Sequence, residues 1–125
     1  MKIIDLSQPI YNKAKDGWNV NYISFPSHIA THVNVPGHAV ESGKTLDDYP
    51  VDAFIGKSVV FQNLESIKKG IGLFFESASI KDEVVQKIIE VRPKFVGVQG
   101  YFESEKELEI EKLLLRNSLC FMVCH

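Results

Sequence analysis

Apolar positions form short runs in the first half of the chain and alternate between strand-like and helix-like periods in the second half. Two continuous apolar runs, residues 58–61 and 71–75, predict central strands that are buried on both faces of a sheet. Shorter apolar or alternating stretches predict further strands at residues 2–6, 20–25, 28–35, 95–98 and 119–123.

One segment of the second half has the clear period of an amphipathic helix. In residues 79–91 the apolar side chains recur at helical spacing behind a capping pattern in which Ser79 precedes Asp82 by three positions. Earlier in the chain, residues 45–48 and 50–54 predict single helical turns, because prolines prevent a longer helix there.

A second amphipathic helix is predicted over residues 103–116. We expect Leu108, Leu113 and Leu114 to form one apolar stripe, with the acidic side chains on the outer surface. Strands in the first half and a strand–helix alternation in the second predict an α/β fold. The expected architecture is a single compact domain, residues 1–125, with a mixed β-sheet and two main helices.

Length and cysteine content are consistent with this architecture. A chain of 125 residues buries enough surface for one core without disulfides or structural metals. Its two cysteines, Cys120 and Cys124, lie four apart in an apolar stretch. We therefore expect reduced core thiols there, in preference to a disulfide or a zinc knuckle.

Charge and hydropathy exclude several classes of partner. The formal net charge is −2 and 24% of the residues are charged, so no basic field favours a nucleic acid or an anionic membrane. The apolar runs are far shorter than a membrane-spanning helix. The first residues lack the long apolar region of a secretory signal. These features predict a cytoplasmic location.

The chemistry-bearing residues cluster in one window. Three of the four histidines, His28, His32 and His38, fall within residues 28–38 together with Asn34. Even positions from 28 to 34 alternate with β-branched residues, which is the pattern of a strand. We therefore expect the imidazoles and Asn34 to point into a cavity while the β-branched side chains enter the core.

Strand geometry sets a condition on any shared site in this window. On a straight strand the Cα atoms of His28 and His32 would lie about 13 Å apart, whereas a metal ion holds each imidazole nitrogen at about 2.0 to 2.1 Å. A shared ion therefore predicts a bend at Ala30 and Thr31. His38 follows a Pro-Gly break and can approach from a separate loop. Two interpretations stay open, namely hydrogen-bonded surface histidines and metal or acid–base chemistry.

These motifs resemble those of the cyclase family that includes the bacterial kynurenine formamidases. That family opens with Ile-Asp-Leu-Ser-x-Pro-Ile, which stands here as Ile4 to Ile10. Its metal motif, His-x-Gly-Thr-His-x-Asp-x-Pro-x-His, aligns with residues 28–38 at the same spacing. A Gly-Lys-Thr segment followed by a short apolar turn recurs from Gly43 to Gly56.

The resemblance implies a fold, a reaction and roles for three histidines. The implied fold is of the swivelling β/β/α type, usually assembled as a homo-oligomer. The implied reaction is hydrolysis of an amide bond by water on a divalent metal, zinc or manganese, as in the arylformamidases of tryptophan catabolism. His28 and His32 match metal ligands, and His38 matches the acid–base histidine. The implied partner is a small-molecule substrate, an aromatic formamide.

Several positions depart from the family pattern. Asn34 stands where the family has Asp, and a neutral amide is a weak ligand for zinc. Ala30 stands where the family has Gly, and a positive φ at Ala costs roughly 1 kcal/mol. The two remaining family ligands, a His at the start of the late helix and a Glu in the last strand, align with Glu111 and Val123. Glu111 can ligate a metal and Val123 cannot, so His125 is the substitute candidate.

Three functions are consistent with these residues. The first is a metal-dependent hydrolase with a single ion at His28 and His32, completed by Asn34 or Glu111, with His38 as the acid–base group. The second is a catalytically inactive relative that serves as a small-molecule binding or assembly module. The third is a structural domain with incidental histidines.

Two further questions stay open at this level. Trp18, Tyr22 and Phe25 either line an aromatic pocket or belong to the core. The chain is also shorter than the family usually is and stops just after an apolar strand. We therefore expect either a degenerate, minimal homologue or a truncated product whose missing tail is supplied by a partner chain.

Overall fold

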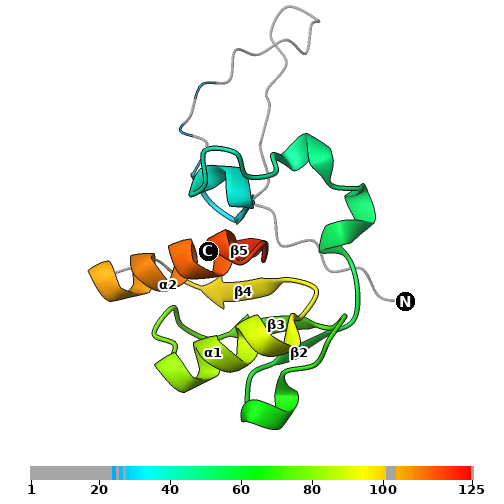
Figure 1. Ribbon diagram of the computed structural model, residues 1–125, viewed down its shortest axis with the longest axis vertical. Coiled ribbons are helices and arrows are strands. Elements are labelled where there is room, and N and C mark those ends of the chain that lie inside the picture. Colours follow the sequence, from blue (N-terminus) through cyan, green and yellow to red (C-terminus); the bar gives the residue numbers. More distant parts are fainter. Residues whose placement is uncertain (1–23, 25, 27, 101–103, 125) are drawn as a thin grey trace, which may run out of the picture.

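The computed structural model describes residues 24, 26, 28–100 and 104–124. Within these residues the strands form one five-stranded sheet in the order β1-β5-β4-β3-β2 (Figure 1). The strands are β1 His32–Asn34, β2 Ser58–Val60, β3 Gly72–Phe75, β4 Val96–Gln99 and β5 Phe121–Cys124. Strands β2 to β5 run parallel and β1 is antiparallel to β5, so the sheet is mixed, as the sequence predicts.

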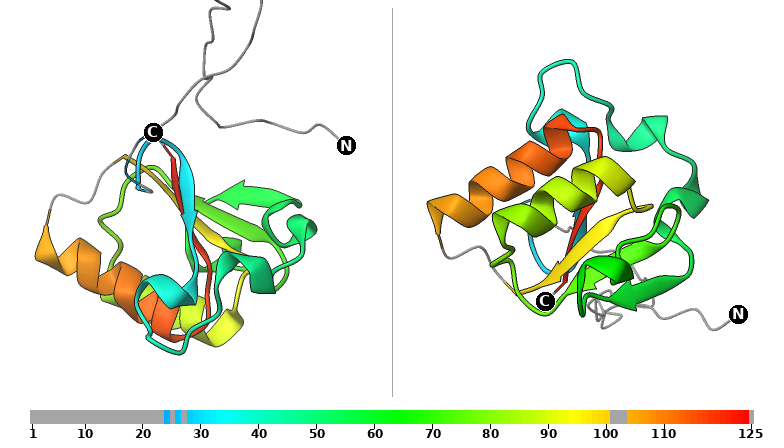
Figure 2. Two further views of the ribbon diagram at one scale, coloured as in Figure 1. Left: turned by 90° about the horizontal axis from the view of Figure 1, so that it is seen from above. Right: turned by 60° about the horizontal axis from the view of Figure 1, so that its bottom comes forward.

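The helices α1, Asp82–Val91, and α2, Glu105–Arg116, connect β3 to β4 and β4 to β5. Both lie on the same face of the sheet (Figure 1 and Figure 2). The core fills the space between the helices and the sheet. Its most deeply buried side chains are Leu73, Ile88, Val96, Val98, Leu114, Leu115 and Phe121. The predicted α/β class with a mixed sheet and two main helices is therefore confirmed for the described residues.

Strand β2 corrects one prediction. The run at residues 58–61 was expected to be a central strand, but β2 lies at the edge of the sheet. Val59 is 37% exposed and Val60 is 52% exposed. A continuous apolar run predicts that a segment forms a β-strand. It does not predict whether that strand has a neighbour on both sides or lies at the edge of the sheet. The run at residues 71–75 is confirmed as a central strand, β3.

The buried face of α2 corrects a second prediction. Leu108 and Leu113 are 43% and 36% exposed, whereas Ile110 and Leu114 face the core. Glu111 is buried on the same face, although the acidic side chains were expected outside. Because leucines lie on both faces of α2, the positions of the apolar residues do not by themselves determine which face of the helix is buried.

The helix ends are set by different residues in the two helices. Ser104 and Glu107 form a capping box at the start of α2. In contrast, α1 begins after Lys81 with no side-chain cap, so the predicted role of Ser79 is wrong. Arg92 adopts a left-handed conformation with φ 60° and ends α1 before Pro93.

The short turns predicted before β2 are confirmed. Leu46–Asp48 and Val51–Phe54 are single 3₁₀ turns, and Thr45 N–H donates a hydrogen bond of 2.8 Å to the Asp48 carboxylate at the start of the first turn. A further 3₁₀ turn at Leu64–Ser66 was not predicted. Both cysteines are free thiols, as expected.

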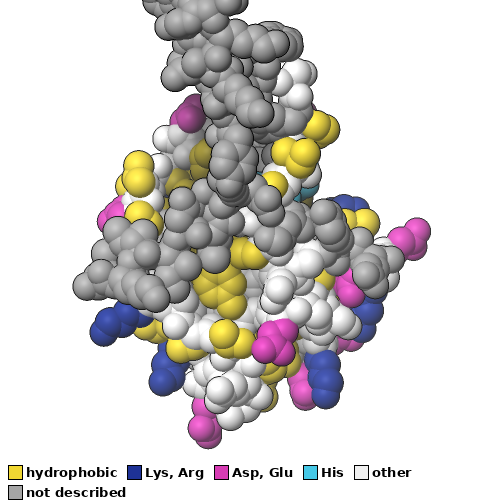
Figure 3. Space-filling model, turned by 180° about the vertical axis from the view of Figure 1, so that it is seen from behind, with side chains coloured by type: hydrophobic (Ala, Val, Ile, Leu, Met, Phe, Trp, Pro, Cys, Tyr) yellow, Lys and Arg dark blue, Asp and Glu magenta, His cyan; other side chains and the backbone are white. Residues whose placement is uncertain are grey.

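The sheet face opposite the helices carries an apolar row. Phe74 lies over Gly97, where a Cβ atom would collide with the phenyl ring, so this strand position requires glycine. The row continues through register partners to Val60 on one side and to Met122 and Val33 on the other. Apolar side chains gather at the centre of this face (Figure 3).

Some predictions fall outside the described residues. These are the strands at residues 2–6 and 20–25, the pocket or core roles of Trp18, Tyr22 and Phe25, and the substitute ligand His125. The single-domain boundary 1–125 also stays a prediction. Among the described helices, none is long and apolar enough to cross a lipid bilayer.

Candidate functional site

The site begins with a bend before β1. The predicted strand over residues 28–35 is wrong in extent, because β1 covers only His32–Asn34. Ala30 has φ 54°, a left-handed conformation that reverses the chain direction. The predicted bend at Ala30 and Thr31 is therefore confirmed. The expected entry of the β-branched residues into the core is wrong, since Ile29 is 50% exposed and Val33 is only half-buried.

This bend brings two imidazoles together. His28 Nδ1 and His32 Nε2 are 3.3 Å apart, within hydrogen-bond distance, and the ring centroids are 5.1 Å apart in an edge-to-face arrangement. His32 Nδ1–H donates a hydrogen bond of 2.8 Å to the Ala30 carbonyl oxygen. In the neutral ring this contact leaves Nε2 as the nitrogen that carries the lone pair. The bend thus sets the spacing of the pair, and the contact with the Ala30 carbonyl favours one tautomer of His32.

His38 reaches the same place from a different loop, as expected. It ends the 3₁₀ turn Pro36–His38, and its ring centroid is 4.3 Å from that of His28. The turn is held by a hydrogen bond of 2.8 Å from Gly37 N–H to the Lys44 carbonyl oxygen. Gly43 packs so closely that a Cβ atom would lie 2.6 to 2.8 Å from the backbone of Pro36. Glycine at position 43 therefore allows His38 to lie beside His28.

Asn34 and Glu111 form a buried pair behind the histidines. Asn34 Nδ2 donates a hydrogen bond of 2.5 Å to Glu111 Oε1, and each residue is only 5% exposed. Asn34 comes from β1 and Glu111 from the middle of α2, not from the helix start that the resemblance implied. Since a buried polar group must be paired, each of these side chains satisfies the other.

The protonation of His28 reflects its neighbours on every side. Burial lowers the pKa of His28, and the charges of His38 and His32 lower it further. The Glu111 carboxylate and a side-chain hydrogen bond with Asn34 act in the opposite direction. The lowering effects are larger, so the site favours the neutral form of His28, which is the form that binds a metal.

The two facing imidazoles have the spacing that a shared metal ion requires. Two nitrogens that each lie 2.0 to 2.1 Å from a tetrahedral ion are about 3.3 Å apart, and His28 Nδ1 and His32 Nε2 have this separation. Among the described residues, however, no three His, Cys, Asp or Glu side chains converge as metal ligands. The donor set thus suits one ion at the imidazole pair, with a third donor still to be supplied.

Among the described residues, neither cysteine joins the imidazole pair in a group of three metal ligands. Burial raises the pKa of the Cys120 thiol and of the Cys124 thiol. A thiol must lose its proton to bind a metal, so a raised pKa disfavours this role.

The structure therefore brings together five of the residues that the sequence singled out, namely His28, His32, Asn34, His38 and Glu111, while His125 lies outside the described residues. They are linked in space through His28 and the Asn34–Glu111 pair. Their roles as ligands and as the acid–base group stay predictions. Sequence reasoning missed a separate cavity at the carboxyl ends of β2 and β3. The available signal was the general rule that ligands bind at this edge of a parallel sheet.

Comparisons with known proteins agree with this fold. The sequence pattern of the cyclase family, described as "Putative cyclase", matches residues 4–99. None of the curated proteins matches the chain. A solved structure described as "The Structure Of Potential Metal-Dependent Hydrolase With Cyclase Activity" superimposes with a TM-score of 0.62 and 18% sequence identity.

The extent of these matches decides what they show. The superposition covers 82% of this chain and 64% of the other, so the chain spans less than two thirds of that protein. At this identity the likeness shows the fold alone. The family pattern covers about three quarters of the chain, in which the histidine window lies. The protein is therefore a member of the cyclase family.

Proposed function

We propose that this protein is a metal-dependent hydrolase that acts on an amide bond, with one divalent ion, zinc or manganese, at His28 and His32. The observation that carries this proposal is the 3.3 Å separation of His28 Nδ1 and His32 Nε2. Family membership and the similar solved structure, described as a potential metal-dependent hydrolase, support the same class of reaction.

The residues of the site have distinct roles in this proposal. When bound, the metal supplies an activated water and polarises the scissile carbonyl. His28 and His32 hold the ion, and the Ala30 carbonyl keeps His32 in the tautomer that directs Nε2 toward the ion. His38 is solvent-exposed beside His28, so it can take a proton at the site and release it to bulk water.

The Asn34–Glu111 pair completes the site in one of two ways. Glu111 places a carboxylate close enough to influence His28, which adds negative charge beside the ion. Asn34 makes side-chain hydrogen bonds with both Glu111 and His28, and its Oδ1 atom is the oxygen that it can offer to the ion. A neutral amide contributes less than a carboxylate would, which favours a single ion over a two-metal centre.

We extend the proposal to substrate and assembly on the family resemblance. The substrate is an aromatic formamide, as for the arylformamidases of tryptophan catabolism. The fold is of the swivelling β/β/α type, and the protein assembles as a homo-oligomer.

Metal content and hydrolysis test the proposal. Elemental analysis of the purified protein after addition of zinc or manganese should find about one ion per chain at the site. H32A should weaken metal affinity by at least about 100-fold, because loss of an outer partner alone costs about 10- to 100-fold. H38A is the matched control, since it should retain the metal but lower formanilide hydrolysis by about 100-fold. A metal stoichiometry near zero and no hydrolysis would contradict the proposal.

A second function is favoured by one specific observation. The Glu111 carboxylate is already hydrogen-bonded to the Asn34 amide, and no third ligand converges on the imidazoles among the described residues. This arrangement suits a catalytically inactive relative that binds a small molecule or takes part in assembly. In that case H32A would change neither ligand binding nor oligomeric state.

A further inference from the structure

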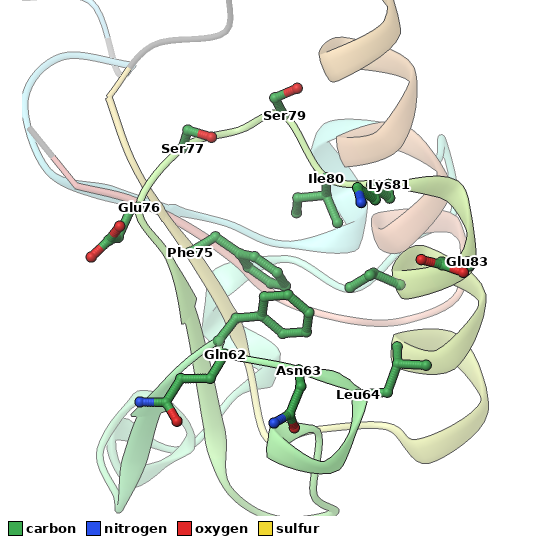
Figure 4. Close-up of a pocket in the computed structure, with 12 residues that line it drawn as sticks. Gln62, Asn63, Leu64, Phe75, Glu76, Ser77, Ser79, Ile80, Lys81 and Glu83 are labelled. Atoms are coloured by element: carbon green, nitrogen blue, oxygen red, sulfur yellow. The ribbon is translucent and has the colours of Figure 1, made fainter.

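A cavity of about 480 Å³ opens at the sheet edge where β2 and β3 end. Its walls are the segment that follows β2, the segment that follows β3, and the first turn of α1. In Figure 4, Phe75 lies at the centre, with Ser77 and Ser79 above it and Asn63 and Leu64 below it. The volume lies within the range of about 300–1,000 Å³ found for small-molecule sites.

The floor of the cavity is aromatic. Phe61 and Phe75 stack with centroids 4.9 Å apart and an interplanar angle of 28°. Ile80 and Val84 complete the apolar surface, and both belong to the buried core. A stacked pair with an apolar flank offers a flat surface to a planar ring, because aromatic groups gain from offset stacking and edge contacts.

The rim of the cavity is polar and carries more negative than positive charge. Within the described part of the chain, the side chains of Gln62, Ser77 and Ser79 make no hydrogen bond to protein, which leaves them for a ligand. Glu76 and Glu83 line the cavity from opposite sides, with the Glu76 carboxylate directed outward (Figure 4), and Lys81 adds one ammonium group. The partial positive charge at the start of α1 is offset by acidic residues in its first turn.

We propose that this cavity binds a planar aromatic small molecule with a cationic substituent. The aromatic floor selects the ring, and the two carboxylates favour the cation over an anion. Hydrogen-bonding groups from Gln62, Ser77 and Ser79 orient the substituent.

The cavity is separate from the histidine site. His32, Val123, Val98 and Phe75 lie on one row across β1, β5, β4 and β3. Three strand spacings separate the ends of this row, which corresponds to about 14 Å. A small formamide bound at the imidazoles would not span this distance. The proposed site is therefore independent of the proposed hydrolase activity, and either can fail without the other.

Three probes of defined charge and shape test the proposal. They are 1-naphthylmethylamine, 1-naphthoate with the same ring and the opposite charge, and cyclohexylmethylamine with the same charge and no aromatic ring. Titration of the full chain, followed by amide chemical shifts in nuclear magnetic resonance spectra, gives both the affinity and the site. We expect shifts at residues 61–64 and 75–84 with the naphthyl cation, and binding at least about tenfold weaker for each of the other two probes.

Two variants establish the location. S77W fills the cavity from an exposed position and should lower affinity for 1-naphthylmethylamine by at least about tenfold. S42W is the matched control, because Ser42 is exposed and does not line the cavity. The double variant E76Q/E83Q should still bind the naphthyl ring but should no longer prefer 1-naphthylmethylamine over 1-naphthoate. Shifts confined to residues 28–38, equal binding of all three probes, or no binding at millimolar concentration would each overturn the proposal.

Discussion

The segment that carries the candidate histidines is mostly exposed, whereas the segment that forms the core is largely buried. Among residues 28–66, all of which the structure describes, only Asn34 and Pro36 are buried. The core cluster is instead drawn from residues 67 to 123, on β3, α1, β4, α2, β5 and the segments next to them. The candidate histidines therefore lie in a segment, residues 28–66, that contributes few buried apolar side chains to the core.

This difference means that the two segments depend on different forces. The core is stabilised by apolar area removed from water. The histidine segment is positioned by backbone features, namely the left-handed Ala30 and the close approach at Gly43, and by the hydrogen bond between Asn34 and Glu111. Substitutions in the core should therefore unfold the whole chain, while those in the histidine segment should alter the site with smaller effects on stability.

The largest effect is expected for L114A. Leu114 is fully buried between α2 and the sheet, so the substitution should lower the free energy of unfolding by about 2–5 kcal/mol. Urea unfolding followed by circular dichroism measures this change. V51A is the control, because Val51 is 84% exposed and should change stability by less than about 0.5 kcal/mol. Similar losses of unfolding free energy in L114A and V51A would show that stability does not depend on the buried segment in preference to the exposed one.

The next effect is expected where the two segments meet. N34D places a second carboxylate against buried Glu111, and like charges at this distance should destabilise the protein by about 2 kcal/mol in the absence of metal. Added zinc should raise the melting temperature of N34D more than that of the unchanged protein, since the ion neutralises the pair. Thermal unfolding with and without zinc measures both changes.

The double variant N34D/E111Q is the matched control for this pair. It exchanges donor and acceptor across the same contact, so the free energy of unfolding should return to within about 1 kcal/mol of the original. If N34D alone leaves stability unchanged without metal, the buried contact does not link β1 to α2 as described.

Patterns that depend on neighbours along the chain predicted most of the fold. Both helices, the short turns around Pro50 and the mixed sheet follow from periodicity and proline positions. The position of β2 did not follow, because only the pairing of distant segments decides which strand lies at an edge. The buried face of α2 was also missed, since Leu113 and Leu114 are adjacent but face different environments.

The same distinction applies to the site. The bend at Ala30 could be predicted, because the reach of an imidazole and the rise of a strand are fixed by covalent geometry. The contact between Asn34 and Glu111 joins residues 77 positions apart, and no local pattern indicates it. A glutamate in an acidic, amphipathic helix is ordinarily solvated, so its burial becomes visible only when α2 is packed on the sheet.

A smaller effect is expected for A30G. Ala30 is held at φ 54°, where a side chain is strained and glycine is not, so the substitution should raise the free energy of unfolding by up to about 1 kcal/mol. A30V, with a β-branched side chain, should lower it. Chemical denaturation of the three proteins measures the series. A lower stability for A30G would show that the left-handed conformation costs nothing at this position.

The smallest effect on stability is expected for a substitution of Tyr49, which contacts Cys120 and so connects the two segments. Burial and a side-chain hydrogen bond with Cys120 raise the pKa of Tyr49 to about 12. An unfolded tyrosine has a pKa of about 10. Above that pH the unfolded chain loses the phenol proton while the folded chain keeps it, so the free energy of unfolding should fall as the pH rises toward 12.

Y49F removes this contribution and should make the decline between about pH 10 and pH 12 shallower. The buried thiol of Cys120, whose pKa is also raised, contributes a decline of the same sign, so some slope should remain in Y49F. Urea unfolding at a series of pH values measures both slopes. An unchanged slope in Y49F would mean that Tyr49 titrates alike in the folded and unfolded chains.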